Sequence, residues 1–159
     1  MTIETGHTVP QATFMTMGED GPAPVSTDDL FSDKRVVLFA VPGAYTPTCS
    51  AKHLPGFKEH AADLKAKGVD TVACTSVNDV FVMDAWGKEQ EAGDVVMLAD
   101  GNGAFAKALG LELDASGFGM GTRSQRYAMV VNDGKVEQLF VEGPGEFKVS
   151  SAEHVLEKL

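Results

Sequence analysis

The chain has 159 residues, enough for one domain with a substantial core, and its 43% hydrophobic and 23% charged residues are ordinary for a globular protein. Its formal net charge of −10 argues against nucleic acid or an anionic membrane as partner, because those partners require clustered Lys and Arg. No apolar run approaches the roughly 20 residues that a membrane-spanning helix needs. We therefore expect a single domain, residues 1–159, that acts on a small or neutral substrate.

The N-terminal sequence and the cysteine content indicate a compartment. Residues 1–6 have neither the basic start and apolar stretch of a secretory signal nor the Arg-rich bias of an organellar presequence. Two cysteines form no disulfide framework, and a reactive thiol fits a reducing environment, so we expect a cytoplasmic protein. The histidines and cysteines show no metal-ligand spacing, so we expect neither a metal nor a cofactor.

The first two thirds of the sequence alternate between short apolar strands and amphipathic helices. Residues 9–17 alternate weakly before a turn at 18–22, which predicts a small hairpin or loop region. Ser26 followed by Asp29 predicts the cap of a short helix. Strands are then expected at residues 36–41, 69–76 and 95–99. Helices are expected at residues 50–67 and 105–109. A further helix between them is expected to begin after a cap at Asn78 or Asp79.

The C-terminal part ends in a hairpin and a helix. Residues 113–121 contain three glycines and are expected to form a loop. Residues 127–132 and 135–141 flank an Asp-Gly turn, which is a strong hairpin signal. A capping-box pattern that starts at Ser150 predicts a final helix at residues 151–159. The order of strands and helices predicts an α/β fold with a partly parallel sheet.

The stretch from Pro42 to Cys49 joins the first buried strand to the helix that follows it. Cys49 therefore stands at the start of a helix, where unpaired backbone N–H groups and the positive end of the helix dipole favour an anion such as a thiolate. Pro42 and Pro47 stiffen the approach, and Thr46 is placed to face the sulfur. The alternative is that Cys49 is a small buried filler behind a capped helix.

Pro42, Thr46 and Cys49 match the Pro-x-x-x-Thr-x-x-Cys motif, and the chain resembles the peroxiredoxins. The sequence Pro-Gly-Ala-Tyr-Thr-Pro-Thr-Cys-Ser at 42–50, followed by His-Leu-Pro-Gly-Phe at 53–57, is similar to the type II, or peroxiredoxin-5-like, branch. The resemblance covers nearly the whole chain. It implies a thioredoxin-like fold, with a central mixed sheet flanked by helices. It also implies reduction of hydrogen peroxide and alkyl hydroperoxides through a sulfenic acid on Cys49.

Attack of a thiolate on a peroxide requires an ionised sulfur and donors for the departing oxygen. For thiols in general, lowering the pKa from about 8.5 to about 6 raises the thiolate fraction at pH 7 about 30-fold but lowers the nucleophilicity about tenfold. Well-placed donors, each worth about 10²–10³ in rate, must therefore supply the larger factors. The candidates are the Thr46 hydroxyl, backbone N–H groups near Gly43 and Cys49, and one of Arg35, Arg123 and Arg126.

Arg126 is the arginine that matches the family motif, and it immediately precedes the expected hairpin. We expect it to hold the Cys49 thiolate and the peroxide oxygens, while Pro42 and Gly43 shape the substrate pocket. Arg123 is expected to be a surface or interface residue. The alternative for Arg126 is an ordinary salt bridge. The hypothesis requires the Arg126 side chain to reach the sulfur and Cys49 to open to solvent.

Cys74 lies in an expected strand and is interpreted as a buried apolar filler, although a resolving role stays open. Two-cysteine members of the branch carry their resolving cysteine just before the last helix, where residues 147–150 of this chain contain none. The resemblance therefore favours a one-cysteine cycle, in which an external thiol reduces the Cys49 sulfenic acid. It suggests glutathione with glutaredoxin, or else thioredoxin, and it implies a homodimer.

His53 follows Cys49 by four residues and shares its helical face, so a cysteine hydrolase is one alternative. No third residue that would orient the histidine is evident, and we expect His53 to be a partly exposed helix residue. A thiol–disulfide oxidoreductase would need a Cys-x-x-Cys pair, which the chain lacks. The remaining alternative is a non-catalytic redox sensor or chaperone.

Overall fold

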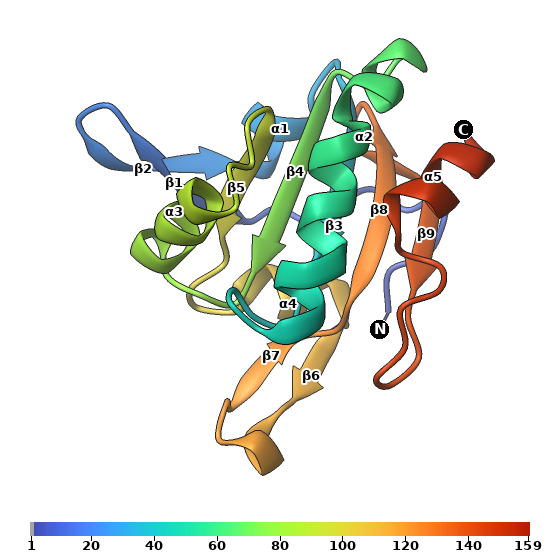
Figure 1. Ribbon diagram of the computed structural model, residues 1–159. Helices are drawn as coiled ribbons and strands as arrows, with labels where there is room; N and C mark the ends of the chain where they lie inside the picture. Colours follow the sequence, from blue (N-terminus) through green and yellow to red (C-terminus); the bar gives the residue numbers. More distant parts are fainter. Residues whose placement is uncertain (1) are drawn as a thin grey trace.

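The computed structural model describes residues 2–159, which form a seven-stranded sheet covered by helices and a small two-stranded ribbon (Figure 1). The strands are β1 (Thr13–Gly18), β2 (Gly21–Ser26), β3 (Arg35–Ala40), β4 (Thr71–Ser76), β5 (Val95–Ala99), β6 (Glu112–Asp114), β7 (Thr122–Ser124), β8 (Tyr127–Asn132) and β9 (Lys135–Val141). The helices are α1 (Thr27–Phe31), α2 (Leu54–Ala66), α3 (Val80–Glu89), α4 (Ala104–Leu109) and α5 (Ala152–Lys158). A π-helical turn, η1 (Cys49–His53), precedes α2, and a 3-10 turn, η2 (Ser116–Phe118), follows β6.

The strands of the large sheet lie in the order β2-β1-β5-β4-β3-β8-β9. The central strands β3, β4 and β5 are parallel, whereas β8 and β9 on one side and β1 and β2 on the other are antiparallel to their neighbours. Parallel neighbours need crossover connections, and α2 and α3 supply them. The expected α/β fold, with a central mixed sheet flanked by helices, is confirmed.

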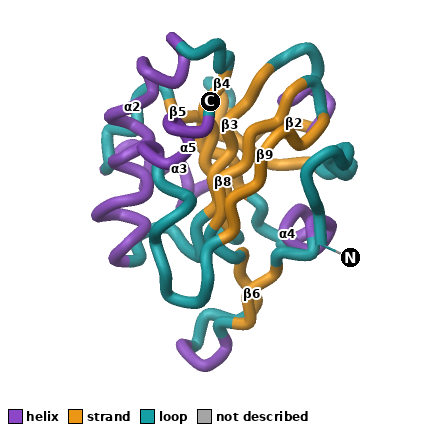
Figure 2. The backbone as a smooth tube through the Cα atoms, turned by 90° about the vertical axis from the view of Figure 1, so that its right-hand side faces the viewer, coloured by secondary structure: helices purple, strands orange, loops and turns teal. Residues whose placement is uncertain are grey.

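Helices cover both faces of the sheet and enclose two hydrophobic cores. Figure 2 shows α2 and α3 on one side of the sheet and α4 on the other. The core under α2 and α3 contains Trp86 and the stacked rings of Phe39 and Phe57, whose centroids are 4.1 Å apart. The opposite core includes Phe14 and Phe105. Within residues 2–159, none of the helices has both the length and the apolar character that crossing a bilayer demands.

Local signals set several element boundaries where the sequence predicted them. The Ser26 side chain caps α1 in a capping box with Asp29. The Asp79 side chain caps α3 by accepting the Val82 N–H at 2.8 Å. Gly110 ends α4 in the left-handed conformation, at a φ of 73°. The N-terminal region, for which the sequence predicted a hairpin or a loop, is a hairpin formed by β1 and β2.

The expected loop at residues 113–121 is confirmed for residues 115–121, whereas residues 113 and 114 belong to strand β6. β6 and β7 pair as an antiparallel ribbon with η2 at its tip, and the Ala115 N–H donates to the Gly121 carbonyl at 2.7 Å. Gly119 and Gly121 take positive φ values of 71° and 67°, which turn the chain at the tip. The glycines therefore mark the turn at the tip of the ribbon. The sequence did not reveal the pairing of β6 with β7, because each strand has only three residues.

The N-cap of the last helix lies one residue later than the expected cap at Ser150. Ser151 is the N-cap residue, and its hydroxyl accepts the His154 N–H at 3.1 Å. Ser150 is buried, and its hydroxyl donates to the Glu142 carboxylate at 2.7 Å. The expected cap is wrong because a tertiary contact takes the first serine and leaves the cap to the second.

The sheet register brings two distant parts of the sequence to one edge. Ala40 at the end of β3 pairs with Tyr127 at the start of β8. The stretch that starts at Pro42 leaves the sheet just after Ala40, and Arg126 enters it just before Tyr127. Antiparallel pairing of β3 and β8 therefore places the cysteine stretch beside Arg126.

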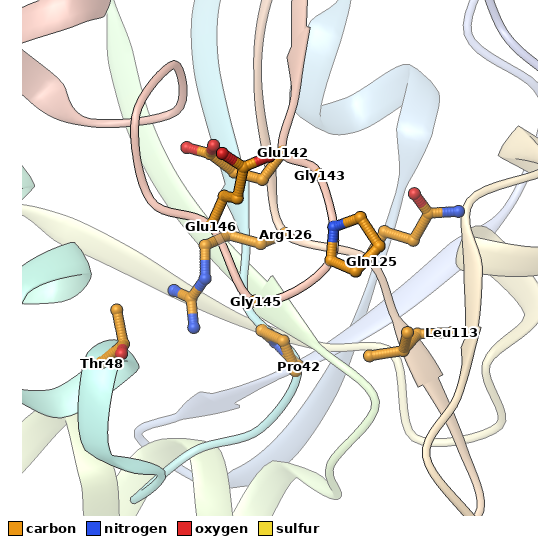
Figure 3. Close-up of a pocket in the computed structure, with 10 residues that line it drawn as sticks. Pro42, Thr48, Leu113, Gln125, Arg126, Glu142, Gly143, Gly145 and Glu146 are labelled. Carbon is orange, nitrogen blue, oxygen red and sulfur yellow. The ribbon is translucent and has the colours of Figure 1, made fainter.

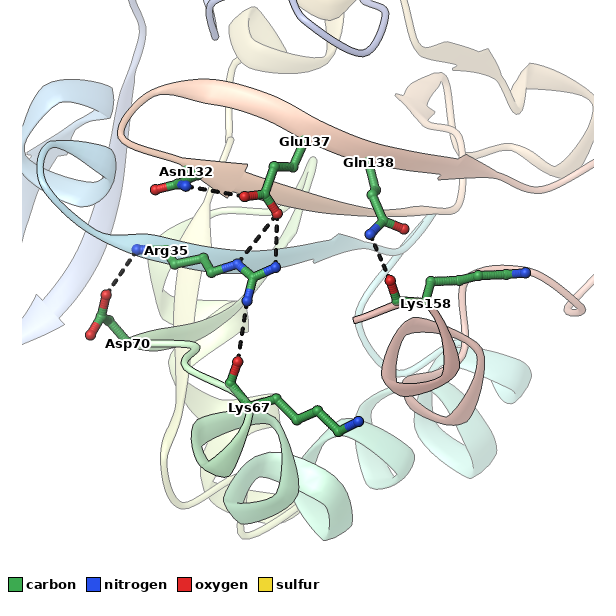
Figure 4. Close-up of polar contacts among 7 residues, drawn as sticks. All are labelled: Arg35, Lys67, Asp70, Asn132, Glu137, Gln138 and Lys158. Atoms are coloured by element: carbon green, nitrogen blue, oxygen red, sulfur yellow. Dashed lines mark hydrogen bonds and ion pairs between the residues drawn. The ribbon is translucent and has the colours of Figure 1, made fainter.

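Arg35 lies at the opposite end of β3 and takes part in a separate polar cluster (Figure 4). Its guanidinium contacts the Glu137 carboxylate on β9 at 2.9 Å and donates to the Lys67 carbonyl at 3.2 Å. Its backbone N–H donates to the Asp70 carboxylate at 2.9 Å. These contacts tie β3 to β9 and to the end of α2, and they exclude Arg35 from the cysteine site.

Two helical glycines give a matched test of helix packing on the sheet. A Cβ on Gly87 in α3 would lie 2.7 Å from Met97 Cγ on β5, whereas a Cβ on Gly56 in α2 would have no atom within 4 Å. Gly56→Ala should raise the free energy of unfolding by about 0.5–1 kcal/mol, because alanine is the better helix former. Gly87→Ala should lower it by about 1–3 kcal/mol through overpacking. Urea unfolding measures both, and equal stability of the two variants would contradict the packing argument.

Candidate active site

The stretch after β3 enters a helix through an unusual first turn. Pro47 and Thr48 already have helical backbone, and in η1 the Leu54 N–H donates to the Cys49 carbonyl five residues earlier. Such π-helical turns are rare and frequently occur at functional sites. The loop before the helix is held by Asn78, whose side-chain oxygen accepts a backbone N–H of the loop at 2.9 Å. Cys49 thus stands in the first turns of a helix, as expected.

Two donors converge on the sulfur of Cys49. The Thr46 hydroxyl lies 2.7 Å from Sγ, and Arg126 Nη2 lies 3.0 Å from it. A guanidinium is always charged and only donates, so the site is built to hold a negatively charged sulfur. The structure brings the three predicted residues together and meets the requirement that Arg126 reach the sulfur, so the simple salt-bridge alternative is wrong. The catalytic roles of the three residues stay predictions.

The Thr46 hydroxyl also lies 2.7 Å from the Gly43 carbonyl. A hydroxyl has one proton, so it donates to the carbonyl or to the sulfur but not to both. Because an ionised acceptor makes the stronger hydrogen bond, the proton turns to the sulfur when Cys49 is a thiolate. Gly43 lies behind Thr46 and has little room for a side chain, since a Cβ there would lie 3.2 Å from Thr46 Cγ2.

His53 is buried, so the expectation of a partly exposed residue is wrong. Its Nε2 lies 2.9 Å from the Ser150 carbonyl, and its Nδ1 lies 2.7 Å from Arg126 Nη1. Burial, followed by the charge of Arg126, lowers the pKa of His53 to about 3. Both ring nitrogens are engaged away from the sulfur, so the geometry does not support a hydrolase-type Cys–His pair. The signal that was missed is spacing, because His53 lies one turn before the buried Phe57.

Arg123 is not the surface residue that its glycine-rich surroundings suggested. It is half-buried, and its side chain donates to the Met120 carbonyl at 2.9 Å and to the Val77 carbonyl at 3.0 Å. Its Nη1 would lie 3.4 Å from a Cβ on Gly43. The surface location was not found because β6 and β7 pair as a ribbon, and Arg123 on β7 packs that ribbon against the loop that carries Thr46, while its place in an interface stays a prediction.

A pocket opens beside the cysteine at the edge of the sheet where β3 ends (Figure 3). Its lining residues are Pro42, Thr48, Leu113, Gln125, Arg126 and the loop from Glu142 to Glu146. Figure 3 shows the Arg126 guanidinium directed toward Thr48 and Pro42. Pro42 and Arg126 thus contribute to the pocket wall, whereas Gly43 supports Thr46 from behind.

Cys49 itself is 0% exposed, so the requirement that it open to solvent is not met. Arg126 both lines the pocket and contacts the sulfur, and the pocket therefore approaches the sulfur through this side chain. A substrate oxygen can touch Sγ only after the side chains that cover it move, because the sulfur is buried. This favours small substrates.

Cys74 is buried on β4, where it pairs with Phe39 on β3. Burial, and then the charge of Cys49, raise the pKa of the Cys74 thiol well above its usual range. Both cysteines are free. Cys74 is therefore a buried filler that keeps its proton, as the sequence indicated.

Comparison with known proteins identifies the family. A family model described as Redoxin matches residues 4–156, so the chain belongs to the redoxin family. Peroxiredoxin-2B of Arabidopsis thaliana is 50% identical over 159 residues, which cover 99% of this chain and 98% of that protein. Within the redoxins, the chain is a peroxiredoxin of the type II, or peroxiredoxin-5-like, branch, and its activity is that of a thiol-dependent peroxidase.

Solved structures agree with this assignment. The reduced Prx3 from Vibrio vulnificus, in complex with H2O2, is 54% identical, with a TM-score of 0.96 over 99% of both chains. Peroxiredoxin 5 from Alvinella pompejana is 33% identical, with a TM-score of 0.85 over 98% of this chain and 96% of that one. The thioredoxin-like fold and the peroxidase activity that the resemblance implied are confirmed.

The low pKa of His53 makes the folded chain sensitive to acid. In the unfolded chain His53 takes up a proton near pH 6.5, whereas in the folded chain it does so only near its pKa of about 3. Neutral His53 therefore contributes fully to the free energy of unfolding above about pH 6.5, and this contribution is lost as the pH falls toward 3. Between about pH 7 and pH 5 the loss amounts to about 2 kcal/mol. His53→Asn should remove this part of the pH dependence. Urea unfolding at the two pH values tests it, and an equal loss in both proteins would contradict it.

Proposed function

We propose that Cys49 is the nucleophile that attacks hydrogen peroxide and alkyl hydroperoxides, and that Thr46 and Arg126 position the peroxide and stabilise the charge that develops. The observation that carries the proposal is the pair of donors on one sulfur, at 2.7 Å and 3.0 Å. Ionisation of a thiol alone gains only a few-fold in rate, whereas one well-placed donor is worth about 10²–10³. The donors are therefore the larger part of the catalytic effect.

The chemical step transfers one oxygen atom and two electrons. The thiolate of Cys49 attacks one peroxide oxygen, an S–O bond forms and the O–O bond breaks. The other oxygen leaves with the bonding electron pair as hydroxide or alkoxide and takes up a proton to become water or an alcohol. Negative charge thus moves from Sγ to the departing oxygen. The guanidinium of Arg126, with five N–H donors in one plane, can follow that charge without moving far.

The pocket beside Cys49 supports small peroxides as substrates. Pro42, Leu113 and Pro144 give it an apolar wall against which a short alkyl group can pack. Hydrogen peroxide needs the least movement of the side chains that cover the buried sulfur. The Vibrio vulnificus relative is described in complex with H2O2, which agrees with this substrate class.

An external thiol is proposed to complete the cycle. It attacks the Cys49 sulfenic acid and releases water, and a second thiol then resolves the mixed disulfide. Residues 147–150 contain no cysteine, and Cys74 is buried as a protonated thiol, which supports a one-cysteine cycle. Glutathione with glutaredoxin is the proposed reductant, with thioredoxin as the second candidate. We also propose a homodimer that works in the reducing cytoplasm, in line with two free cysteines.

Single-turnover oxidation tests the roles of the site residues. Reduced protein is mixed with about one equivalent of hydrogen peroxide and followed by intact mass and by Trp86 fluorescence, because the indole donates to Ser50 beside the cysteine at 3.0 Å. Cys49→Ser should abolish the fast addition of one oxygen, and Arg126→Ala should slow it by about 10²–10³. Arg35→Ala, a matched loss of a guanidinium at the far end of β3, should change the rate by less than about twofold.

Two outcomes would contradict the proposal. Oxidation of the wild-type protein at the rate of a free thiol would favour a redox sensor. A wild-type rate in the Arg126→Ala variant would remove Arg126 from the reaction.

The one-cysteine cycle predicts that Cys74 is dispensable for turnover. Cys74→Ala should retain steady-state peroxidase activity with glutathione and glutaredoxin within about twofold of wild type, because the proposed resolving thiol comes from outside. The activity is measured by coupled oxidation of NADPH. Loss of turnover, or a disulfide between Cys49 and Cys74 by mass spectrometry, would show an internal resolving step instead.

A further inference from the structure

The guanidinium of Arg126 has a second partner on the side away from the sulfur. Nη2 lies 3.0 Å from Cys49 Sγ, while Nη1 lies 2.7 Å from His53 Nδ1. We propose that His53 is a positioning residue that fixes the orientation of Arg126 toward the sulfur and the peroxide, and that Glu142 holds His53 through Ser150. The inference rests on the proposed role of Arg126 and adds two residues to the machinery behind it.

The hydrogen bonds of His53 define one neutral tautomer. Arginine can only donate, so Nδ1, which faces Arg126, must carry the lone pair. A carbonyl can only accept, so Nε2, at 2.9 Å from the Ser150 carbonyl, must carry the proton. The ring is packed among Phe39, Phe57 and Phe147, with centroid distances of 4.9, 5.6 and 5.0 Å. The histidine therefore presents one fixed acceptor to the guanidinium.

Glu142 holds the carbonyl that fixes His53. Its carboxylate accepts the Ser150 hydroxyl at 2.7 Å and the backbone N–H groups of residues 148, 149 and 150 at 2.8–2.9 Å. The backbone N–H of Glu142 donates to the Arg126 carbonyl at 3.0 Å. Burial opposes the charge, but these hydrogen bonds outweigh it and keep the pKa of Glu142 below its usual range. One residue thus fixes both the backbone of Arg126 and the loop that locks His53.

A neutral partner suits the proposed role of Arg126 better than a carboxylate would. A carboxylate on Nη1 would orient the guanidinium but would also offset its charge. Neutral His53 orients the side chain and leaves the full positive charge for the thiolate and the departing oxygen. The charged groups that act on the imidazole are Arg126 and Glu142, and the negative charge of Glu142 is engaged by the loop N–H groups. A misplacement of about 1 Å can lower a rate about 100-fold, so orientation has a large effect.

Matched variants test whether His53 acts through Arg126. His53→Leu removes the acceptor, and the rate constant for oxidation by hydrogen peroxide should fall about 10- to 100-fold. His53→Asn places a side-chain oxygen near the position of Nδ1 and should recover most of that loss. His60→Leu, the same change at a histidine of α2 that contacts Asp63 and Glu153, should stay within about twofold of wild type. Urea unfolding of each variant reports stability separately.

A double-mutant cycle distinguishes positioning from general damage to the fold. In an Arg126→Ala background, His53→Leu should slow oxidation by less than about twofold, because the residue it orients is gone. Equal slowing in both backgrounds, or a wild-type rate for His53→Leu in the native background, would overturn the inference. If Arg126→Ala alone reacts at the wild-type rate, the proposed function fails instead.

The wild-type protein provides a test that needs no variant. In protein with ¹⁵N-labelled histidine, His53 should show the neutral Nε2–H tautomer from about pH 5 to pH 8. A protonated Nδ1 in that range would leave Arg126 Nη1 without an acceptor and would overturn the inference. Glu142→Gln, which loses an acceptor of the loop N–H groups, should also slow oxidation several-fold, and a rate equal to wild type would remove Glu142 from the scheme.

Discussion

The contact between the Arg126 guanidinium and the Cys49 sulfur is the interaction on which the rest of the structure depends. The two residues are 77 positions apart in sequence, and the antiparallel register of β3 and β8 brings them to one sheet edge. That register is fixed by close packing on both faces, because a slip of one residue would move every side chain of a strand into the opposite core, where its neighbours fit a different shape. The same strand register therefore packs the core and places Arg126 beside Cys49.

The electrostatics of the site differ from those of the molecule as a whole. The chain carries a formal net charge of −10, but the side chain directed at the sulfur is a cation. The nearby carboxylate of Glu142 accepts hydrogen bonds from backbone N–H groups, and the histidine beside Arg126 is neutral, so neither forms an ion pair with the guanidinium. An uncharged peroxide meets no long-range repulsion from the acidic surface, and it meets a concentrated positive charge only at the sulfur.

The sequence contains enough local information for most of the fold. The β8–β9 hairpin follows from alternation around an Asp-Gly turn, and the cap of α3 at Asp79 follows from one side chain and the helix beside it. The cysteine, Thr46 and Arg126 could be chosen from spacing and from the family resemblance, and the structure brings them together.

The residues that sequence reasoning missed are those whose roles depend on distant partners. His53 contacts Ser150 and Arg126, which are 97 and 73 positions away in the sequence. The residues next to His53 in the sequence predict neither contact. Ser150 was assigned to a cap because the local pattern fits one, whereas a contact to Glu142 decides its place. Arg123 likewise depends on Val77. Solvent access to Cys49 could not be read from the sequence at all, because it depends on side chains that four separate segments bring together.

The π-helical turn at Cys49–His53 limits how this site can change during evolution. Each residue advances an α-helix by about 100°, so deleting one residue from the turn would rotate the cysteine by that angle relative to the apolar stripe of α2. Either the sulfur would leave its donors, or Leu54 and Phe57 would leave the core. Substitutions can therefore accumulate in this segment, but its length cannot drift, and insertions or deletions among homologues should be absent between the cysteine and α2.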